Sequence, residues 1–131
     1  MRIPGLSIVC WSLAVVSSLL AGCTTEHLCT EEARASVQVT LSDAQGVAIA
    51  AATVRFQVNG GDWQDATCIS TDTSLCTEWV TGYETEGTYN IEASKEGYET
   101  GTATTEVTLT DDGCHVDTQQ VSITLNAASG G

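Results

Sequence analysis

The segment Gly87-Thr88-Tyr89-Asn90-Ile91-Glu92-Ala93-Ser94 decides the fold class of this chain. Tyr89, Ile91 and Ala93 are apolar, and a single polar residue separates each from the next. Successive side chains of a β-strand point to opposite faces, so a period of two places the apolar set against a core and the polar set in water. The segment therefore predicts a half-buried β-strand.

The same alternation recurs on both sides of this segment. It predicts clear strands over residues 36–41, 52–58, 106–110 and 120–125, and weaker ones near 63–68 and 76–81. The apolar members of the clear runs are Val37, Val39, Leu41, Ala52, Val54, Phe56, Val58, Val107, Leu109, Val121, Ile123 and Leu125. Sustained helical periodicity is absent from the sequence after the leader, and threonine, which is common there, favours a pleated surface. We expect an all-β fold, an antiparallel sandwich of about seven short strands.

Turn residues separate these strands. In Ser42-Asp43-Ala44-Gln45-Gly46, the aspartate can accept hydrogen bonds from the turn backbone and the glycine can take a positive φ. Asn59-Gly60-Gly61 ends the next run in a similar way.

The order of several short motifs is more informative than any one of them. They are Asp43 and Gly46, Ile49, Ala52-Thr53-Val54, Gly87-Thr88-Tyr89-Asn90-Ile91 and Gly97-Tyr98. This order resembles the carboxypeptidase regulatory-like domain over residues 35–125, which implies a transthyretin-like or immunoglobulin-like sandwich. The chain departs from that pattern at Ala48 and Ala51, where such domains usually carry proline and glycine, and in an insert from Cys68 to Cys76. The resemblance implies a domain without catalysis of its own, although a sandwich hosts many unrelated functions.

Residues 1–22 have the layout of an export signal. Met1-Arg2 gives a short positive end, and Ile8 to Leu20 gives an apolar, helix-forming segment. Leu20-Ala21-Gly22-Cys23 resembles a bacterial lipobox, which implies cleavage between Gly22 and Cys23 and lipidation of the cysteine. The alternative is an uncleaved membrane helix, but the leader carries four serines that dilute its apolar character, Ser7, Ser12, Ser17 and Ser18.

A lipidated Cys23 would place the protein at the cell envelope. Two or more acyl chains, palmitate among them, anchor a protein stably, so the membrane is an expected partner. Thr24 stands where aspartate would retain many such proteins at the inner membrane, which favours the outer membrane. We expect a lipidated linker over residues 23–34, the sandwich over 35–125 and a flexible tail over 126–131.

The chain after the leader is strongly acidic and fits one domain. It has 109 residues, enough for a single core. Without Arg2, 17 acidic residues face three basic ones, a net charge of −14. Polyphosphate backbones and anionic lipid surfaces would repel this charge, so nucleic acid is not an expected partner.

Four cysteines remain if Cys23 carries lipid, an even set in an exported chain, and this indicates disulfides. Three pairings are possible, and we favour Cys68 with Cys76 and Cys29 with Cys114. His27, separated from Cys29 by one residue, and His115, adjacent to Cys114, leave a zinc site as an alternative, although this spacing is unlike that of structural zinc sites. The turn containing Asp111, Asp112 and Asp117 leaves a calcium site as a second alternative. The other interpretation of this turn is an ordinary solvated turn.

The remaining candidate is Trp63, which follows Gly60-Gly61-Asp62. It is either a core or edge residue of the sandwich or an exposed contact for a sugar or a protein. We expect Trp79, Tyr89 and Tyr98 to be core or corner residues. Carboxylates such as Glu31, Glu32, Glu84 and Glu86 look like solvated surface.

No recognisable catalytic constellation accompanies these candidates, so we expect neither an enzyme nor a cofactor. We expect a protein-binding or structural module of the envelope. The alternatives are a domain that binds carbohydrate or calcium through the loops of residues 60–76, and an accessory of a separately encoded envelope enzyme.

Overall fold

The computed structural model of the chain describes residues 28–129. The chain divides into two compact units, residues 1–30 and residues 31–131. Only residues 28–30 of the first unit are described, and they have no regular secondary structure. All described strands belong to the second unit. Over residues 28–129, no helix is both long enough and apolar enough to cross a membrane.

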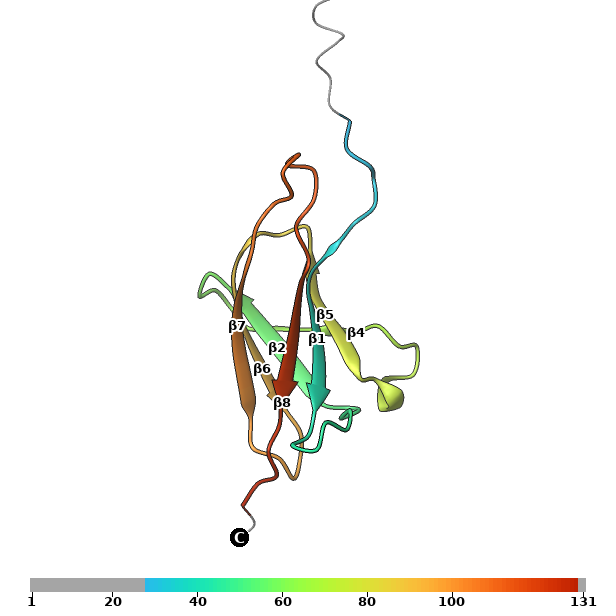
Figure 1. The fold of residues 1–131 in the computed structure, drawn as a ribbon, viewed down its shortest axis with the longest axis vertical. Helices are drawn as coiled ribbons and strands as arrows, with labels where there is room; N and C mark the ends of the chain where they lie inside the picture. Colours follow the sequence, from blue (N-terminus) through green and yellow to red (C-terminus); the bar gives the residue numbers. More distant parts are fainter. Residues whose placement is uncertain (1–27, 130–131) are drawn as a thin grey trace, which may run out of the picture. The chain divides into compact units, whose positions relative to one another are not determined.

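Two four-stranded β-sheets make up the second unit (Figure 1). Sheet A has the order β4-β5-β1-β8, and sheet B has the order β3-β2-β6-β7. The strands in the described part of the chain are β1 (Ala35–Ser42), β2 (Thr53–Val58), β3 (Gln64–Asp65), β4 (Thr67–Cys68), β5 (Glu78–Tyr83), β6 (Gly87–Ser94), β7 (Gly101–Val107) and β8 (Gln119–Thr124). The predicted all-β sandwich is confirmed, with two very short strands where one weak run was expected.

One strand pair departs from the expected antiparallel arrangement. β8 runs parallel to β1, with Val39 opposite Val121. The cause is the connection of residues 108–118, which carries the chain from β7 in sheet B across to sheet A. A parallel pair needs such a crossover, whereas a tight hairpin joins antiparallel neighbours.

The core forms where alternate residues of the two sheets meet. β6 buries the apolar set that the sequence predicted, and β1 and β2 bury theirs in the same way. These buried residues are Val37, Val39, Leu41, Val54, Phe56, Tyr89, Ile91 and Ala93. The rings of Phe56 and Tyr89 stack with their centroids 5.8 Å apart. Trp79 is also buried and Tyr98 packs against the core, as expected for both.

The strand predicted around Val107 begins earlier than expected and ends sooner. β7 starts at Gly101, and Leu109 lies beyond its end with 44% of its surface exposed. The prediction that Leu109 faces the core is therefore wrong. Its backbone pairs with Val116 in an isolated bridge, so it belongs to the loop between β7 and β8.

The first turn has the geometry that the sequence predicted. Asp43 Oδ1 accepts hydrogen bonds from the backbone N–H groups of Gln45 and Val47, both at 2.9 Å. Gly46 has φ +83°. Ala51 has φ +58°, a left-handed conformation, at a position where the resembling domains usually carry glycine.

The chain changes sheets between β3 and β4. β3 pairs with β2 in sheet B, and β4 pairs with β5 in sheet A. Between them, Ala66 N–H donates to the Val54 carbonyl at 2.9 Å. One extended stretch thus closes this side of the sandwich and leads directly into the loop between Cys68 and Cys76.

The C-terminal segment still forms backbone hydrogen bonds after the last predicted strand ends. Glu99 N–H donates to the Asn126 carbonyl at 2.8 Å, and Ala128 N–H donates to the Gly97 carbonyl at 2.9 Å. The turn after β6 therefore supplies backbone partners to residues 126–128 of the expected tail, and the flexibility of this tail stays a prediction. Residues 130 and 131 lie outside the described residues.

Thr81 in β5 carries an unpaired hydroxyl. The residue is 0% exposed, and its Oγ1 has no hydrogen-bond partner within residues 28–129. A buried polar group without a partner costs roughly 1–3 kcal/mol, and valine keeps the branched shape without the hydroxyl. We expect Thr81→Val to raise the free energy of unfolding by about 1–2 kcal/mol in urea denaturation. Thr67→Val on exposed β4 is the control, and a less stable Thr81→Val protein would contradict the prediction.

Candidate functional site

Both predicted disulfides are present. Cys68 and Cys76 are bonded, with their Cα atoms 5.9 Å apart. Cys29 and Cys114 form the second disulfide. The disulfide between Cys29 and Cys114 uses the two cysteines that the zinc alternative required, and His27 lies outside the described residues. The part of the chain that the structure describes holds no group of three or more histidine, cysteine, aspartate or glutamate residues suited to a metal ion.

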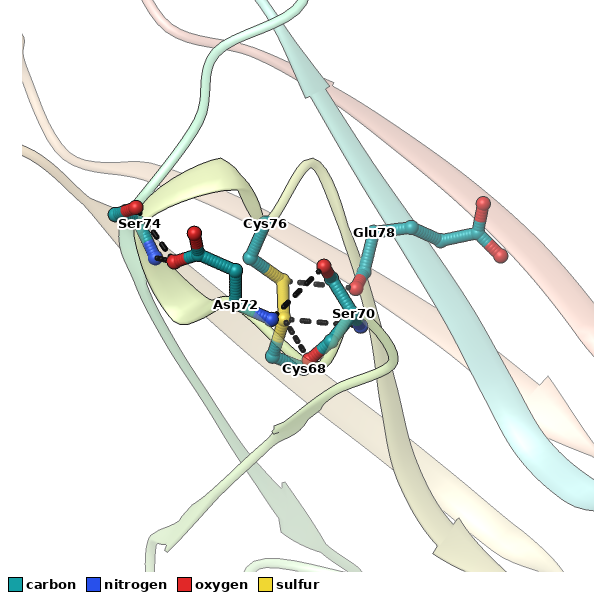
Figure 2. The surroundings of a disulfide bond; sticks show 6 residues. All are labelled: Cys68, Ser70, Asp72, Ser74, Cys76 and Glu78. Carbon is teal, nitrogen blue, oxygen red and sulfur yellow. Dashed lines mark hydrogen bonds between the residues drawn. A yellow bond between two sulfur atoms is a disulfide. The ribbon is translucent and has the colours of Figure 1, made fainter.

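The disulfide Cys68–Cys76 closes a loop that is ordered by its own short polar residues (Figure 2). A single 3₁₀ turn, η1 (Thr73–Leu75), lies within it. Asp72 caps this turn, because its Oδ1 accepts from Ser74 N–H at 2.9 Å and from Ser74 Oγ at 2.6 Å. Ser70 N–H donates to Cys68 Sγ at 3.3 Å. Local hydrogen bonds therefore fix the loop in addition to the covalent bond.

Two further bonds join this loop to the rest of the fold. Ile69 N–H donates to the Glu78 carbonyl at 3.2 Å, and Ala51 N–H donates to the Cys76 carbonyl at 2.8 Å. Cys76 Sγ lies 3.1 Å from the Glu78 carbonyl oxygen, a contact without a shared proton because the sulfur is oxidised. The loop is thus held against β5 and the segment that precedes β2.

An open depression of about 400 Å³ lies beside the disulfide. It is lined by Ala51, Ala52, Ala66, Cys68, Thr73, Ser74, Cys76 and Trp79. Alanines and the disulfide leave the space open, and the buried Trp79 gives it an aromatic wall. On the same loop, Ile69 is 54% exposed and Leu75 is 67% exposed. We call this surface the disulfide-loop depression.

Trp63 does not pack in the core but takes the edge position that the sequence interpretation also allowed. It is 41% exposed and lies just before β3 at the edge of sheet B. The Arg55 guanidinium carbon lies 4.6 Å from the ring centroid, a cation–π contact. Arg55 Nε in turn donates to Glu92 Oε1 at 2.7 Å. The indole is held in place on the surface.

The outer face of sheet B continues from this stack as a polar row. Asn90 Nδ2 donates to Gln57 Oε1 at 3.3 Å, and Thr104 Oγ1 donates to Asn90 Oδ1 at 2.9 Å. This row crosses β2, β6 and β7 in register. It offers amide and hydroxyl groups next to an exposed aromatic ring.

The outer face of sheet A is also polar, with a shallow hollow of about 230 Å³. Its lining residues are Gln38, Thr40, Glu78, Gln120, Val121 and Ser122. Thr40 Oγ1 and Ser122 Oγ lie 3.1 Å apart in a hydrogen bond across β1 and β8. Because this hollow contains no aromatic side chain, it offers less to a ligand than the other two surfaces.

In the acidic turn for which calcium was an alternative, Asp112 is hydrogen-bonded within the turn. Asp112 Oδ1 accepts from Thr110 Oγ1 at 2.6 Å and from Cys114 N–H at 3.0 Å. These bonds describe an ordinary capped turn and give no support to the calcium alternative.

Glu84 is exposed at the surface, as expected, and both of its carboxylate oxygens are also hydrogen-bonded. Its Oε1 accepts from Val116 N–H at 3.0 Å, and its Oε2 is hydrogen-bonded to Nδ1 of His115, a residue only 6% exposed. The hydrogen bond from Val116 N–H is the larger cause, and the His115 hydrogen bond the next, of a lowered pKa for the Glu84 carboxyl. This pair connects the turn after β5 to the loop between β7 and β8.

This pKa shift gives a pH-dependent contribution to stability. A carboxyl whose folded pKa is lowered stabilises the fold above its unfolded pKa, near 4.5, and loses that contribution as the pH falls through the folded pKa. We expect Glu84→Gln to lower the free energy of unfolding at neutral pH, with the gap from wild type closing as the solution is acidified. Urea titrations across this range measure it, with the exposed Glu86→Gln as the control. A gap that is independent of pH would contradict the assignment.

The one histidine of the described residues belongs to neither of these candidate surfaces. His115, the one histidine in residues 28–129, is buried and hydrogen-bonded to Glu84. Neither the disulfide-loop depression nor the Trp63 surface contains a histidine.

Comparison with known proteins adds no further assignment. No protein-family model matches the chain, and no curated protein matches it. The predicted signal segment, the cleavage site at Gly22 and Cys23, and the lipidation of Cys23 lie outside the described residues. The structure brings Trp63 and the disulfide cysteines to different surfaces, and no sequence pattern indicated the depression.

Proposed function

We propose that this protein is a lipid-anchored, non-catalytic module of the cell envelope that binds another envelope protein. The lipobox resemblance of Leu20-Ala21-Gly22-Cys23 supports the anchor. The resemblance to the carboxypeptidase regulatory-like domain, also a proposal, supports a domain that accompanies other proteins rather than one that does chemistry.

The observation that carries the binding proposal is the exposure of Ile69 and Leu75 on a covalently closed loop. Single exposed apolar residues are common on protein surfaces. These two are each adjacent to a cysteine of the disulfide, and the loop borders a depression large enough for a side chain. Because the loop is already ordered, little conformational entropy would be lost on binding.

The anchor has a direct test. Cys23→Ala is expected to release the mature protein from membranes, and Cys10→Ala in the leader is expected to leave it membrane-bound. Mass spectrometry of the N-terminal peptide from the wild-type protein should show a lipid-modified Cys23 as the first residue. A free thiol at Cys23, or a retained leader, would refute the anchor.

Protein binding is tested by chemical cross-linking in intact cells followed by mass spectrometry. The proposal expects reproducible cross-links to one envelope protein, and these should persist when the chain is expressed at its natural level. A chain that cross-links to nothing under conditions that capture known envelope complexes would contradict it.

A second candidate function is carbohydrate binding on sheet B, supported by the exposed Trp63 beside the polar row of Gln57, Asn90 and Thr104. Aromatic rings and planar amide groups suit the faces and hydroxyls of sugars. Saturable binding on a glycan array that Trp63→Ala abolishes, and that Tyr83→Ala at another exposed aromatic does not, would support it. Absence of saturable binding would refute carbohydrate binding and leave protein binding as the one proposed function.

A further inference from the structure

We infer that the disulfide-loop depression receives an apolar side chain from a positively charged segment of the partner protein. This inference rests on the proposed protein-binding function and specifies its surface and the chemistry of its partner.

The lining of the depression is mixed: Thr73 and Ser74 are polar, and three alanines, the disulfide and Trp79 supply apolar surface. Ala51, Ala52 and Ala66 present methyl groups, and Cys76 and Trp79 give buried, polarisable surface. The exposed Leu75 and Ile69 on the same loop can extend the apolar contact around the partner's side chain.

The depression is held in a defined shape before any partner arrives. The disulfide closes its loop, Asp72 caps η1 through Ser74, and Ala51 is tied to Cys76 by a 2.8 Å hydrogen bond. These bonds connect the two segments that face each other across the depression. A preformed pocket loses little free energy to ordering when it binds.

The charge of the protein determines the kind of partner. Arg34 pairs with Glu32 at 2.8 Å, Arg55 pairs with Glu92 at 2.7 Å, and Lys95 Nζ donates to the Ala50 carbonyl. These are the three cations within residues 28–129, so each is already engaged inside the protein.

One exposed carboxylate lies beside the depression, and the protein as a whole is acidic. Asp72 directly precedes the lining residues Thr73 and Ser74, and 17 acidic residues face three basic ones in the chain after the leader. Hydrogen bonds from the Ser74 hydroxyl and backbone lower the pKa of Asp72, which keeps it ionised. A second copy of this chain would bring the same negative charge, and like charges across an interface are unfavourable. A segment with lysine or arginine next to its apolar side chain is complementary.

Site-specific photo-cross-linking in cells tests this inference with the full-length, anchored protein. Benzoylphenylalanine replaces Thr73, an exposed residue at the depression, or Thr102, an exposed residue on β7 in the other sheet. We expect adducts from position 73 and few from position 102. Mass spectrometry should map the adduct to a partner peptide with an apolar residue flanked by lysine or arginine.

Two charge variants sharpen the test. Leu75→Glu is expected to lower the adduct yield from position 73 about tenfold or more, since it removes apolar area and adds a negative charge. Leu109→Glu, at an exposed leucine of the loop between β7 and β8, is expected to leave the yield unchanged. Thermal unfolding of both variants checks that they are folded.

The other outcomes overturn the inference in distinguishable ways. Adducts to a glycan, to an acidic peptide or to a second copy of this chain would refute the stated partner chemistry. Adducts from position 102 alone, or equal yields at both positions, would refute the surface while leaving the protein-binding function in place. No adduct from any surface position would refute both the surface and the proposed function.

Discussion

Replacing Gly101 with valine is expected to lower the free energy of unfolding by about 3 kcal/mol, the upper end of the usual cost of overpacking a core. Gly101 begins β7, where that strand passes close to β8. A Cβ atom at this position would lie 2.6 Å from Ile123 Cγ2 and 2.6 Å from Leu125 Cδ2. Both neighbours are buried, at 4% and 0% exposure, so neither has free space into which to move.

This result decides between two opposed effects. Valine is a better strand former than glycine, by up to about 1 kcal/mol, so propensity alone predicts a more stable protein. Steric overlap at 2.6 Å predicts the opposite and is the larger effect. Urea denaturation measures the sign, and Thr102→Val at the next, exposed position is the control, with an expected change within about 0.5 kcal/mol.

A second-site change tests the mechanism of this loss. Leu125→Ala removes one of the two atoms that a new Cβ would meet, so Gly101→Val should cost less in that background than in the wild type. Additive effects of the two substitutions would show that the loss arises elsewhere.

The close approach at Gly101 also explains what the sequence could and could not predict. β6 was predicted correctly because its inward residues are apolar and its outward residues are polar, which gives a clear period of two. The first inward positions of β7 are Gly101, Ala103 and Thr105, none of which is a large apolar residue, and at Gly101 the neighbouring Ile123 and Leu125 leave no room for a side chain. Small residues give no apolar signal, so the start of this strand was missed and Leu109 was wrongly placed inside.

The candidate site, too, could be predicted from the sequence only in part. The pairing of Cys68 with Cys76 followed from an even number of cysteines in an exported chain and from their proximity in sequence. The depression could not be predicted, because it depends on Ala51 and Ala66, whose side chains matter by leaving space empty. The hydrogen bond between Glu84 and His115 spans 31 positions and requires a loop to cross between sheets, and no local pattern reports it.

The disulfide beside the depression gives the second large effect that we expect. Cys68→Ala/Cys76→Ala should lower the free energy of unfolding by about 2–3 kcal/mol in the chain-entropy treatment, because the bond closes a loop with a sequence separation of eight. The sandwich should still fold, since the core strands of both sheets lie outside this loop. Urea denaturation without reductant, which preserves Cys29–Cys114, isolates the contribution of this bond.

The same double variant separates the stability of the fold from the function of the loop. Without the covalent closure, η1 and the residues around it lose their fixed position against Ala51, so the adduct yield from position 73 should fall together with the stability. Thr71→Ala, an exposed change within the same loop that keeps the disulfide, should alter neither. If the double variant kept its full cross-linking yield, a pre-ordered loop would be unnecessary for docking, and the partner would have to order the loop as it binds.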